Sequence, residues 1–564
     1  MVDNNNRIVI IGGVAAGMKT ACRLRRLDPK AQITVVDKGI NLSYGACSLP
    51  YFIEGLFDDL DDVRKTPAGV IRDENFFAKV KGFDVLSSTE ALAIDRTQRL
   101  VKIKDLRNGQ ERDLPYDSLV LATGNRPIMP PLPGMDLEGV VPLKTMENAE
   151  QIDRMARTAK SAVIVGGGLI GLEVAEALIK RRVKVTLLEM KDQVMATALD
   201  FGMAALVHRE LRKNGVDLRL SEGLERIEGE GGKVTSVKTA GGTYPADLVL
   251  VAIGVRPETG LAKEAGLNIG PSGAIAVNDQ MRTSDERIYA AGDCAETTDL
   301  LSGRKVYVPL GSTANKHGRI VADNICGRQE RFPGILGSLI VKVFNLNVGR
   351  SGLSVEDAHL LGHDAVSILV PSPDKVHVYP DAKPIIIKLV ADRSSRRLLG
   401  VQIVGPGDVA KRLDVCITGL TMGMTVDQLA QLDLSYAPPF SGAMDPLHQA
   451  ANALRNKLDG MAESLDPTVV KGCLENGEDI LLLDVRSPAE HEEVRIPGAQ
   501  LVPLGMLRNR LDELPRHKLI VPFCKVSLRG YEAALILKNA GFDKVKYMEG
   551  GILGWPFELD AGLP

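Results

Sequence analysis

One local pattern occurs twice in this chain and restricts its fold more than any other feature. An apolar strand runs into a glycine-rich turn and then a helical pattern, first around Gly12–Gly17 and again around Gly166–Gly171. Such a turn opens a βαβ unit whose helix N-terminus binds a pyrophosphate. In each copy a second apolar strand ends in an acid, Asp37 or Glu189, placed to bond a ribose hydroxyl. Val14 replaces the middle glycine of the first turn, but two complete copies still predict two dinucleotide sites.

The second acid, Glu189, also indicates which nucleotide binds there. A carboxylate at the end of that strand accepts hydrogen bonds from the 2′- and 3′-hydroxyls of a ribose and repels a 2′-phosphate. Met190 follows it where an arginine would favour the phosphate, and Lys191 only partly offsets this preference. We therefore expect NADH rather than NADPH.

Three strand-like runs outside these copies indicate how the domains interleave. Leu119–Gly124 ends in a tight turn just before the second copy, Val249–Gly254 repeats this turn just after it, and Ile288–Asp293 ends in a carboxylate. We infer an α/β protein with two interleaved Rossmann-like dinucleotide-binding domains. The first is expected over residues 1–150 and 275–330, and the second over 151–274. An α+β domain is expected over 331–450, a linker over 451–464 and a small parallel α/β domain over 465–564.

The bulk properties agree with a globular protein of several domains. The 564 residues are too many for one hydrophobic core, and the net charge of −3 gives no reason to expect a nucleic-acid partner. No signal peptide or membrane-spanning run is expected, and no metal site is predicted. The seven cysteines are scattered and do not form a disulfide framework, which favours a reducing cytoplasm.

Residues 1 to about 450 resemble the pyridine nucleotide–disulfide oxidoreductases, in particular the single-cysteine branch with coenzyme A-disulfide reductases and NADH oxidases. The motifs that carry the resemblance stand in the family's order: Gly12–Gly17, Ala122–Gly124, Gly166–Gly171, Ala291–Asp293, Pro309–Lys316 and Tyr436–Phe440. The resemblance implies FAD in the first domain and a nicotinamide nucleotide in the second. It also implies a homodimer in which the third domain completes the partner's active site.

The same resemblance assigns cofactor-binding residues. For FAD they are Gly12, Gly13, Ala15, Ala16, Gly17, Asp37, Lys38, Thr123, Gly124, Gly292, Asp293 and Ala314. For NAD(H) they are Gly166, Gly168, Leu169, Ile170, Gly171, Glu189 and Gly254.

Cys47 is the expected redox residue. The position five residues later is Phe52, so the two-cysteine pair of glutathione reductase-like enzymes is absent, and one sulfur must pass the electrons. We expect a lowered pKa for this thiol, near the flavin and a helix start, so that it acts as a nucleophile. The remaining cysteines outside the C-terminal domain's loop are interpreted as small buried side chains: Cys22, Cys294, Cys326, Cys416 and Cys473.

The substrate-binding residues follow from the coenzyme A-disulfide branch. That branch places an asparagine before the redox cysteine and a glycine after it, whereas this chain has Ala46 and Ser48. The resemblance still implies coenzyme A contacts from Arg23, Arg26, Ser43 and Cys47, with guanidinium groups on phosphate. Tyr379 and Tyr436 match catalytic tyrosines that reach across the dimer toward the substrate thiol. His448 is interpreted as structural.

The C-terminal unit resembles a single-domain rhodanese. The motifs that carry this resemblance are Leu483–Arg486, Cys524–Arg529, Glu549–Gly551 and Trp555. A six-position loop from Cys524 to Arg529 can direct successive amides at the sulfur, which stabilises a thiolate and a persulfide alike. Ser527 stands where the family usually has glycine. The resemblance implies catalytic roles for Cys524 and Arg529.

These features together predict an enzyme that oxidises NADH through FAD and reduces coenzyme A persulfide, polysulfide or coenzyme A disulfide. The rhodanese-like domain would carry sulfur as a persulfide on Cys524. A linker of roughly 15 residues would span about 50 Å when extended. We therefore hypothesise that the rhodanese-like domain moves to deliver its sulfur to the reductase site. One alternative is an NADH oxidase or peroxidase that cycles Cys47 through a sulfenic acid. The other is a sulfur-trafficking or redox-sensing module whose partner is a protein.

Overall fold

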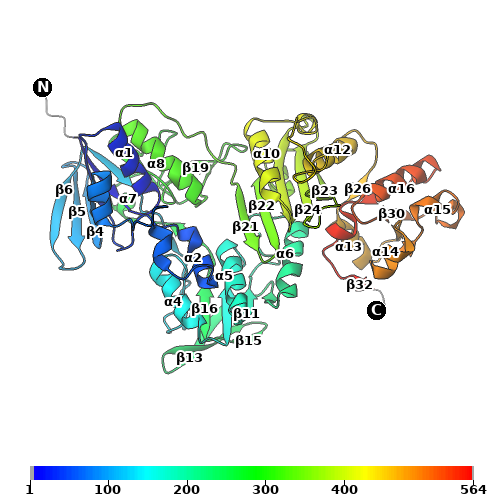
Figure 1. Cartoon of the computed structure of the whole chain (residues 1–564), viewed down its shortest axis with the longest axis horizontal. Helices are drawn as coiled ribbons and strands as arrows, with labels where there is room; N and C mark the ends of the chain where they lie inside the picture. Colours follow the sequence, from blue (N-terminus) through cyan, green and yellow to red (C-terminus); the bar gives the residue numbers. More distant parts are fainter. Residues whose placement is uncertain (1–5, 562–564) are drawn as a thin grey trace. The chain divides into compact units, whose positions relative to one another are not determined.

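The computed structural model describes residues 6–561 and has a mixed α/β fold, as predicted (Figure 1). The chain forms two compact units. One ends at Met190 and resumes over Glu222–Ile335, and the other comprises Lys191–Ser221 and the chain from Leu336 onward. Within residues 6–561 every helix is too short or too polar to traverse a lipid bilayer.

The first sheet of the first unit is entirely parallel, with strand order β18-β7-β1-β2-β3. Its strands are β1 (Arg7–Ile11), β2 (Gln32–Val36), β3 (Asp84–Leu86), β7 (Ser118–Leu121) and β18 (Ile288–Ala290). They read as apolar runs because helices, including α1 (Ala16–Leu27) and α8 (Gly311–Ile325), pack beside them. A strand from residues 288–290 thus pairs with one from 118–121 across the second nucleotide unit.

The second sheet contains β11 (Lys184–Leu188), β10 (Ser161–Val165), β16 (Leu248–Val251) and β9 (Val140–Val141), in that order. Helices α4 (Met146–Ala156) and α5 (Leu169–Lys180) accompany it. The short antiparallel pair β8 (Asn125–Pro127) and β17 (Val255–Pro257) joins the two nucleotide regions. The unit also contains two three-stranded antiparallel sheets. One consists of β4 (Thr89–Asp95), β5 (Leu100–Asp105) and β6 (Glu111–Pro115), and the other of β13 (Leu224–Glu230), β14 (Lys233–Thr239) and β15 (Gly242–Pro245).

The core of the first sheet also contains Ala262 and Leu267, around the short helix α7 (Gly260–Glu264). Residues before 275, where we expect the first nucleotide domain to resume, therefore already pack with that sheet.

The second unit is built on a five-stranded antiparallel sheet of order β21-β22-β25-β24-β23. Its strands are β21 (Leu339–Val343), β22 (Leu346–Gly352), β23 (Ala365–Pro373), β24 (Pro384–Asp392) and β25 (Leu398–Gly405). Helices α10 (Val409–Thr421) and α12 (Pro446–Leu458) pack on it. Helix α6 (Phe201–Lys213) also contacts this sheet, although sequence analysis assigns its residues to the second nucleotide domain.

The C-terminal domain has β27 (Ile480–Asp484) between β29 (Gln500–Leu501) and β30 (Leu519–Phe523), all parallel. Strand β26 (Ser464–Leu465) pairs with β31 (Tyr547–Met548). Its helices include α13 (Pro467–Glu475), α14 (Pro488–Glu493), α16 (Leu528–Asn539) and α17 (Gly551–Gly554).

The C-terminal domain is docked in this structure rather than held by an extended tether, and delivery by domain movement stays a hypothesis. The expected linker is helical as far as Leu458, and Ser464–Leu465 already form the strand β26 that pairs with β31 of the C-terminal domain. Glu549, 1 % exposed, accepts hydrogen bonds from the Leu369 amide at 2.9 Å, Lys457 Nζ at 2.7 Å and Ser464 Oγ. A second buried cluster joins Lys388 Nζ to Asp200 at 2.8 Å and Asp466 at 3.4 Å. Buried charges with several partners fix the domain against the antiparallel sheet.

Candidate active site

Two positions of the first glycine turn leave no room for a side chain. Gly12 has a φ of +114°, and an added Cβ there would lie 2.1 Å from the Ala122 carbonyl oxygen. A Cβ on Gly17 would lie 1.8 Å from the Gly12 carbonyl oxygen, so the helix start packs directly on the turn. The Asp37 carboxylate accepts hydrogen bonds from the Gly13 amide at 2.5 Å and the Gly39 amide at 2.7 Å. The acid is thereby held at the turn, where a dinucleotide's ribose would lie.

The second turn repeats this geometry. A Cβ on Gly166 would lie 2.5 Å from the Ala252 carbonyl oxygen, and one on Gly171 would lie 2.1 Å from the Gly166 carbonyl oxygen. Glu189 accepts a hydrogen bond from the Gly167 amide at 2.7 Å. No atom lies within 4 Å of the Cβ position of Gly168, at the start of α5. This open side of the turn leaves room for a phosphate at a helix N-terminus.

The other predicted cofactor residues of the first unit surround these turns. Gly292 lies between α1 and α8, because a Cβ there would be 3.0 Å from Ala16 Cβ and 3.4 Å from Ala314 Cβ. Thr123 Oγ1 donates to the Glu258 carbonyl at 2.6 Å, and Gly124 has open space on its Cβ side. The rest flank the turns: Ala15 caps α1, Lys38 follows Asp37, Leu169 and Ile170 open α5, and Gly254 follows β16.

The region around Asp293 contains two buried polar atoms without a well-formed hydrogen bond among residues 6–561. Asn125 Nδ2 donates to Asp293 at 2.7 Å, but Asn125 Oδ1 and the Tyr307 hydroxyl are buried without a hydrogen bond. Buried polar atoms normally have a partner, and a bound polar molecule provides one. Burial raises the pKa of Asp293, against an opposing effect of Lys144. These features fit the polar parts of an FAD, and the sequence analysis missed Asn125, Tyr307 and Lys144.

Cys47 lies in a short 3₁₀ turn (Ala46–Ser48) that leads into helix α2 (Leu49–Glu54). It is exposed, unlike Cys294, Cys416 and Cys524, which are buried. Its loop is attached to the first glycine turn, because the Ser43 amide donates to the Gly13 carbonyl at 2.9 Å. The predicted redox cysteine and coenzyme A residue Ser43 therefore lie beside the first nucleotide turn.

The protein's own groups raise the pKa of Cys47, whereas the expected lowering depends on a bound flavin and stays a prediction. Although the residue is exposed, neighbouring atoms partly desolvate its thiol, which is the largest cause; the carboxylates Glu173 and Asp293 follow, whereas Lys144 acts in the opposite direction. A neutral thiol at this position is not a strong nucleophile. A lowering would have to come from a bound cofactor or substrate.

Glu173 and Tyr51 form a pair that the sequence analysis did not identify. The Tyr51 hydroxyl donates to Glu173 at 3.3 Å, which joins α2 to α5. Burial raises the pKa of Glu173 to about 7 and that of Tyr51 to about 12. A carboxyl group that titrates near neutral pH beside a redox cysteine can hold a proton for the reaction. Tyr51 belongs to the cysteine motif, but nothing in the sequence pairs it with Glu173.

The predicted coenzyme A arginines differ in their surroundings. Arg23 pairs with the buried Asp323 through Nη2 at 2.8 Å and Nε at 3.3 Å, which joins α1 to α8. Arg26 is exposed on α1. Arg23 therefore approaches a phosphate only with the donors that Asp323 leaves free.

The two predicted tyrosines lie in loops of the second unit. Tyr379 lies between β23 and β24, and Tyr436 lies before α12 with its side chain exposed.

The C-terminal domain brings Cys524 and Arg529 into one loop. Cys524 is buried at the end of β30, and its carbonyl accepts the Ile552 amide at 2.9 Å. Ser527 has a φ of +100°, a conformation that favours glycine, at the start of α16. Arg529 forms a double ion pair with Glu490 at 2.7 and 2.8 Å, which lowers the pKa of Glu490 to about 2. The sulfur position is thus enclosed by a loop, a helix start and a fixed cation.

Three protein-family models match the chain in succession. They are pyridine nucleotide-disulphide oxidoreductase over residues 6–318, the dimerisation domain of that family over 339–448, and rhodanese-like domain over 466–557. Two solved structures extend over nearly the whole chain. An NAD-dependent persulfide reductase from A. fulgidus is 46% identical with a TM-score of 0.93, covering 97% of this chain and 100% of that one. Bacillus anthracis CoADR-RHD is 34% identical with a TM-score of 0.90, covering 98% of each.

Two shorter relatives match the chain without its C-terminal part. The NAD(P)H coenzyme A polysulfide/persulfide reductase of Pyrococcus horikoshii is 37% identical, over 80% of this chain and 98% of that one. An NADH oxidase of Methanocaldococcus jannaschii is 36% identical, over 80% of this chain and 99% of that one. The resemblance inferred from the motifs is confirmed: this chain belongs to the pyridine nucleotide-disulphide oxidoreductase family, whose cofactors are FAD and NAD(P)H, and carries a C-terminal rhodanese-like domain.

Proposed function

We propose that the chain is an FAD-dependent reductase that uses NADH to reduce coenzyme A persulfide, polysulfide or coenzyme A disulfide through Cys47. The rhodanese-like domain would carry the sulfur as a persulfide on Cys524. The observation that carries the proposal is the presence of two sulfur sites in one chain. One is an exposed thiol attached to a nucleotide turn, and the other is a buried thiol in a loop closed by Arg529. The names of the relatives that share both parts support it.

The proposed residue roles follow from the geometry of each unit. Asp37 and the turn Gly12–Gly17 would hold FAD, while Glu189 and the turn Gly166–Gly171 would hold NADH. Bound FAD would accept the hydride of NADH and supply two electrons to the sulfur substrate. Cys47 would attack the S–S bond of a persulfide, forming a mixed disulfide and releasing hydrosulfide. Over a whole cycle, one persulfide, one NADH and one proton yield one thiol, one hydrogen sulfide and one NAD⁺.

Further groups would bind and protonate the substrate. Arg23, Arg26 and Ser43 would contact coenzyme A. In a homodimer, which the dimerisation domain suggests, Tyr379 and Tyr436 would reach the substrate thiol of the other subunit. A phenol there can donate the proton that a leaving thiolate needs. Mass spectrometry of the purified protein tests for a coenzyme A-sized adduct on Cys47.

Two single variants separate the roles of the sulfur sites. Cys47→Ser should abolish NADH-dependent release of sulfide and reduction of coenzyme A disulfide. Cys524→Ser should retain reduction of free coenzyme A disulfide but fail with sulfane sulfur donors. Equal loss of both activities in Cys524→Ser contradicts the division of labour, and undiminished sulfide release by Cys47→Ala contradicts the whole proposal.

The second candidate is an NADH oxidase or peroxidase. It is favoured by the exposure of Cys47 and by Ala46 in place of the asparagine of the coenzyme A branch. Peroxide would then oxidise Cys47 to a sulfenic acid with release of water, and the electrons of NADH would reduce that sulfenic acid back to the thiol. Anaerobic NADH consumption with polysulfide, compared with aerobic consumption without it, distinguishes the two functions.

A further inference from the structure

Two exposed loops of the second unit carry the tyrosines to which the proposed function gives a role. The first loop, residues 374–383, connects β23 and β24 and contains Tyr379. The second loop, residues 430–445, connects α11 (Val426–Leu429) and α12 and contains Tyr436. Exposed apolar side chains accompany them, among them Phe440, which is 70 % exposed. Loops of this kind lose their order unless specific contacts offset the conformational entropy.

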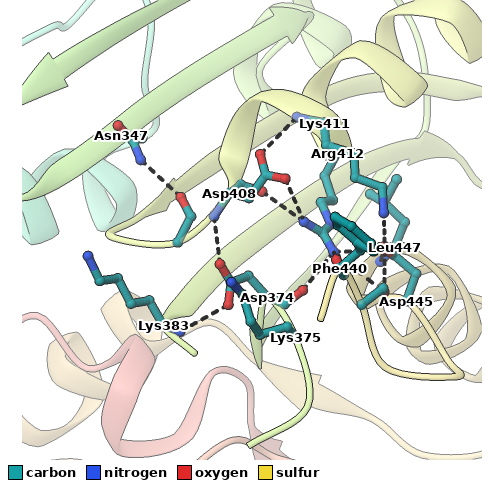
Figure 2. Close-up of polar contacts among 12 residues, drawn as sticks. Asn347, Asp374, Lys375, Lys383, Asp408, Lys411, Arg412, Phe440, Asp445 and Leu447 are labelled. Atoms are coloured by element: carbon teal, nitrogen blue, oxygen red, sulfur yellow. Dashed lines mark hydrogen bonds and ion pairs between the residues drawn. The ribbon is translucent and has the colours of Figure 1, made fainter. Parts of the chain in front are cut away.

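One guanidinium group contacts both loops. Arg412 lies on α10 and is only 1 % exposed. Its Nη2 donates to the Asp374 carbonyl at 2.7 Å in the first loop and to the Phe440 carbonyl at 3.3 Å in the second (Figure 2). The two loops are thereby joined through a single side chain, although they lie far apart in the sequence.

The charge of Arg412 is balanced within the same cluster. Arg412 Nη2 pairs with Asp445 at 3.0 Å, and Nη1 pairs with Asp408 at 3.2 Å. Asp445 also accepts the Leu447 amide at 3.0 Å and the Ser441 hydroxyl at 2.8 Å, so it caps α12 and holds the end of the second loop. Burial alone would raise the pKa of Asp445, but the Leu447 amide, Arg412 and Ser441 together lower it. The pair is therefore ionised, and charge-assisted bonds are the stronger kind.

Asp374 closes the first loop at its base. Its carboxylate accepts the Lys383 amide at 2.9 Å and the Asp408 amide at 3.0 Å (Figure 2). Its own amide donates to the Lys383 carbonyl at 2.9 Å. The first loop is thus attached to the start of α10, one turn before Arg412.

We propose that Arg412, with Asp445 and Asp374, is a positioning residue that fixes the two tyrosine loops relative to one another. The inference rests on the proposed function, because it gives the shared position of the loops a role in the reaction. Arg412 itself need not touch the substrate. A lysine in its place keeps the positive charge but lacks the several N–H donors that a planar guanidinium directs at different acceptors. It should therefore not bind both loops at once.

Hydrogen exchange of the holoenzyme, followed by mass spectrometry, tests the coupling. Arg412→Lys should accelerate exchange in residues 374–383 and in residues 430–445 by at least about tenfold, the factor for losing one hydrogen bond to a charged group. Asp374→Asn should accelerate hydrogen exchange only in the first loop. This variant serves as the test if Arg412→Lys does not fold. The matched control is Arg393→Gln, which breaks an exposed ion pair with Asp364 beyond the opposite ends of β24 and β23 and should affect neither loop.

A kinetic measurement separates positioning from general destabilisation. In Arg412→Lys, kcat with the sulfur substrate should fall about tenfold or more, while the rate of flavin reduction by NADH stays unchanged. Unchanged exchange in both loops, acceleration that extends to β23–β25, or an equal loss in flavin reduction overturns the proposal. Full turnover of Tyr379→Phe and Tyr436→Phe would instead contradict the proposed roles of the tyrosines and leave the coupling of the loops intact.

Discussion

Replacing Lys457 by methionine should release the C-terminal domain from the antiparallel sheet. Lys457 Nζ donates to Glu549 at 2.7 Å and to the Ser367 carbonyl at 2.9 Å. Glu549 is almost fully buried and would keep only the Leu369 amide and the Ser464 hydroxyl as partners. Because Lys457 is itself partly exposed, we expect a loss of about 2–3 kcal/mol, the range for a hydrogen bond between charged groups.

The chain's single tryptophan makes this loss measurable. Trp555 is 2 % exposed in the core of the C-terminal domain, so its fluorescence reports the unfolding of that domain in urea. A loss of this size should lower the midpoint by about 1–2 M for a domain of roughly 100 residues. The matched control is Lys471→Met, which breaks an exposed ion pair with Glu475 on α13 and should cost at most about 0.5 kcal/mol. Equal midpoints for the two variants would refute the reasoning.

Three further predictions concern single groups. Arg529 holds the pKa of Glu490 at about 2, below its unfolded value, so its stabilisation is present above about pH 4.3 and is lost as the pH falls toward 2. Urea unfolding from pH 6 to pH 2 should show this loss in the native protein and a smaller one in Glu490→Gln. The pKa of Glu173, raised to about 7, predicts a transition near neutral pH in the rate of NADH-dependent sulfide release. Glu173→Gln should abolish it, and an unchanged pH profile would exclude the group from the reaction. Gly168→Ala should raise the KM for NADH severalfold with unchanged thermal unfolding, since only open space adjoins it, whereas Gly171→Ala should lower the melting temperature. A lower melting temperature for Gly168→Ala, with a raised KM for NADH in Gly171→Ala, would contradict a phosphate site beside Gly168.

The nucleotide turns were predictable because their constraints are local in sequence. Gly12 and Gly17 are five residues apart, across the loop between β1 and α1, and Asp37 returns to the same loop just after the next strand. A regular spacing of glycine, apolar residues and an acid therefore describes the whole geometry. Apolar runs at residues 365–370, 384–389 and 398–404 likewise indicate strands of the antiparallel sheet, and β23, β24 and β25 contain these runs and extend them by one to three residues.

The polar clusters could not be predicted, since their members come from distant segments. Arg412 meets Asp374 and Asp445 only after the sheet and two helices have formed. Lys388 finds Asp200 and Asp466 in the same way. The raising effect of the protein's own groups on the pKa of Cys47 has a related cause, because it comes from burial and from side chains such as Glu173 that no motif connects to the cysteine. Local patterns report backbone requirements, whereas electrostatics depends on the complete fold.

Because buried salt clusters attach the C-terminal domain to the antiparallel sheet, removing this domain from the chain should destabilise the remainder. A chain cut after Leu458 would leave the Leu369 amide without its acceptor and Lys388 with one carboxylate, Asp200, in place of two. Such a truncated reductase would expose the polar surface that the C-terminal domain covers. It would need compensating replacements at these positions to fold stably without that domain.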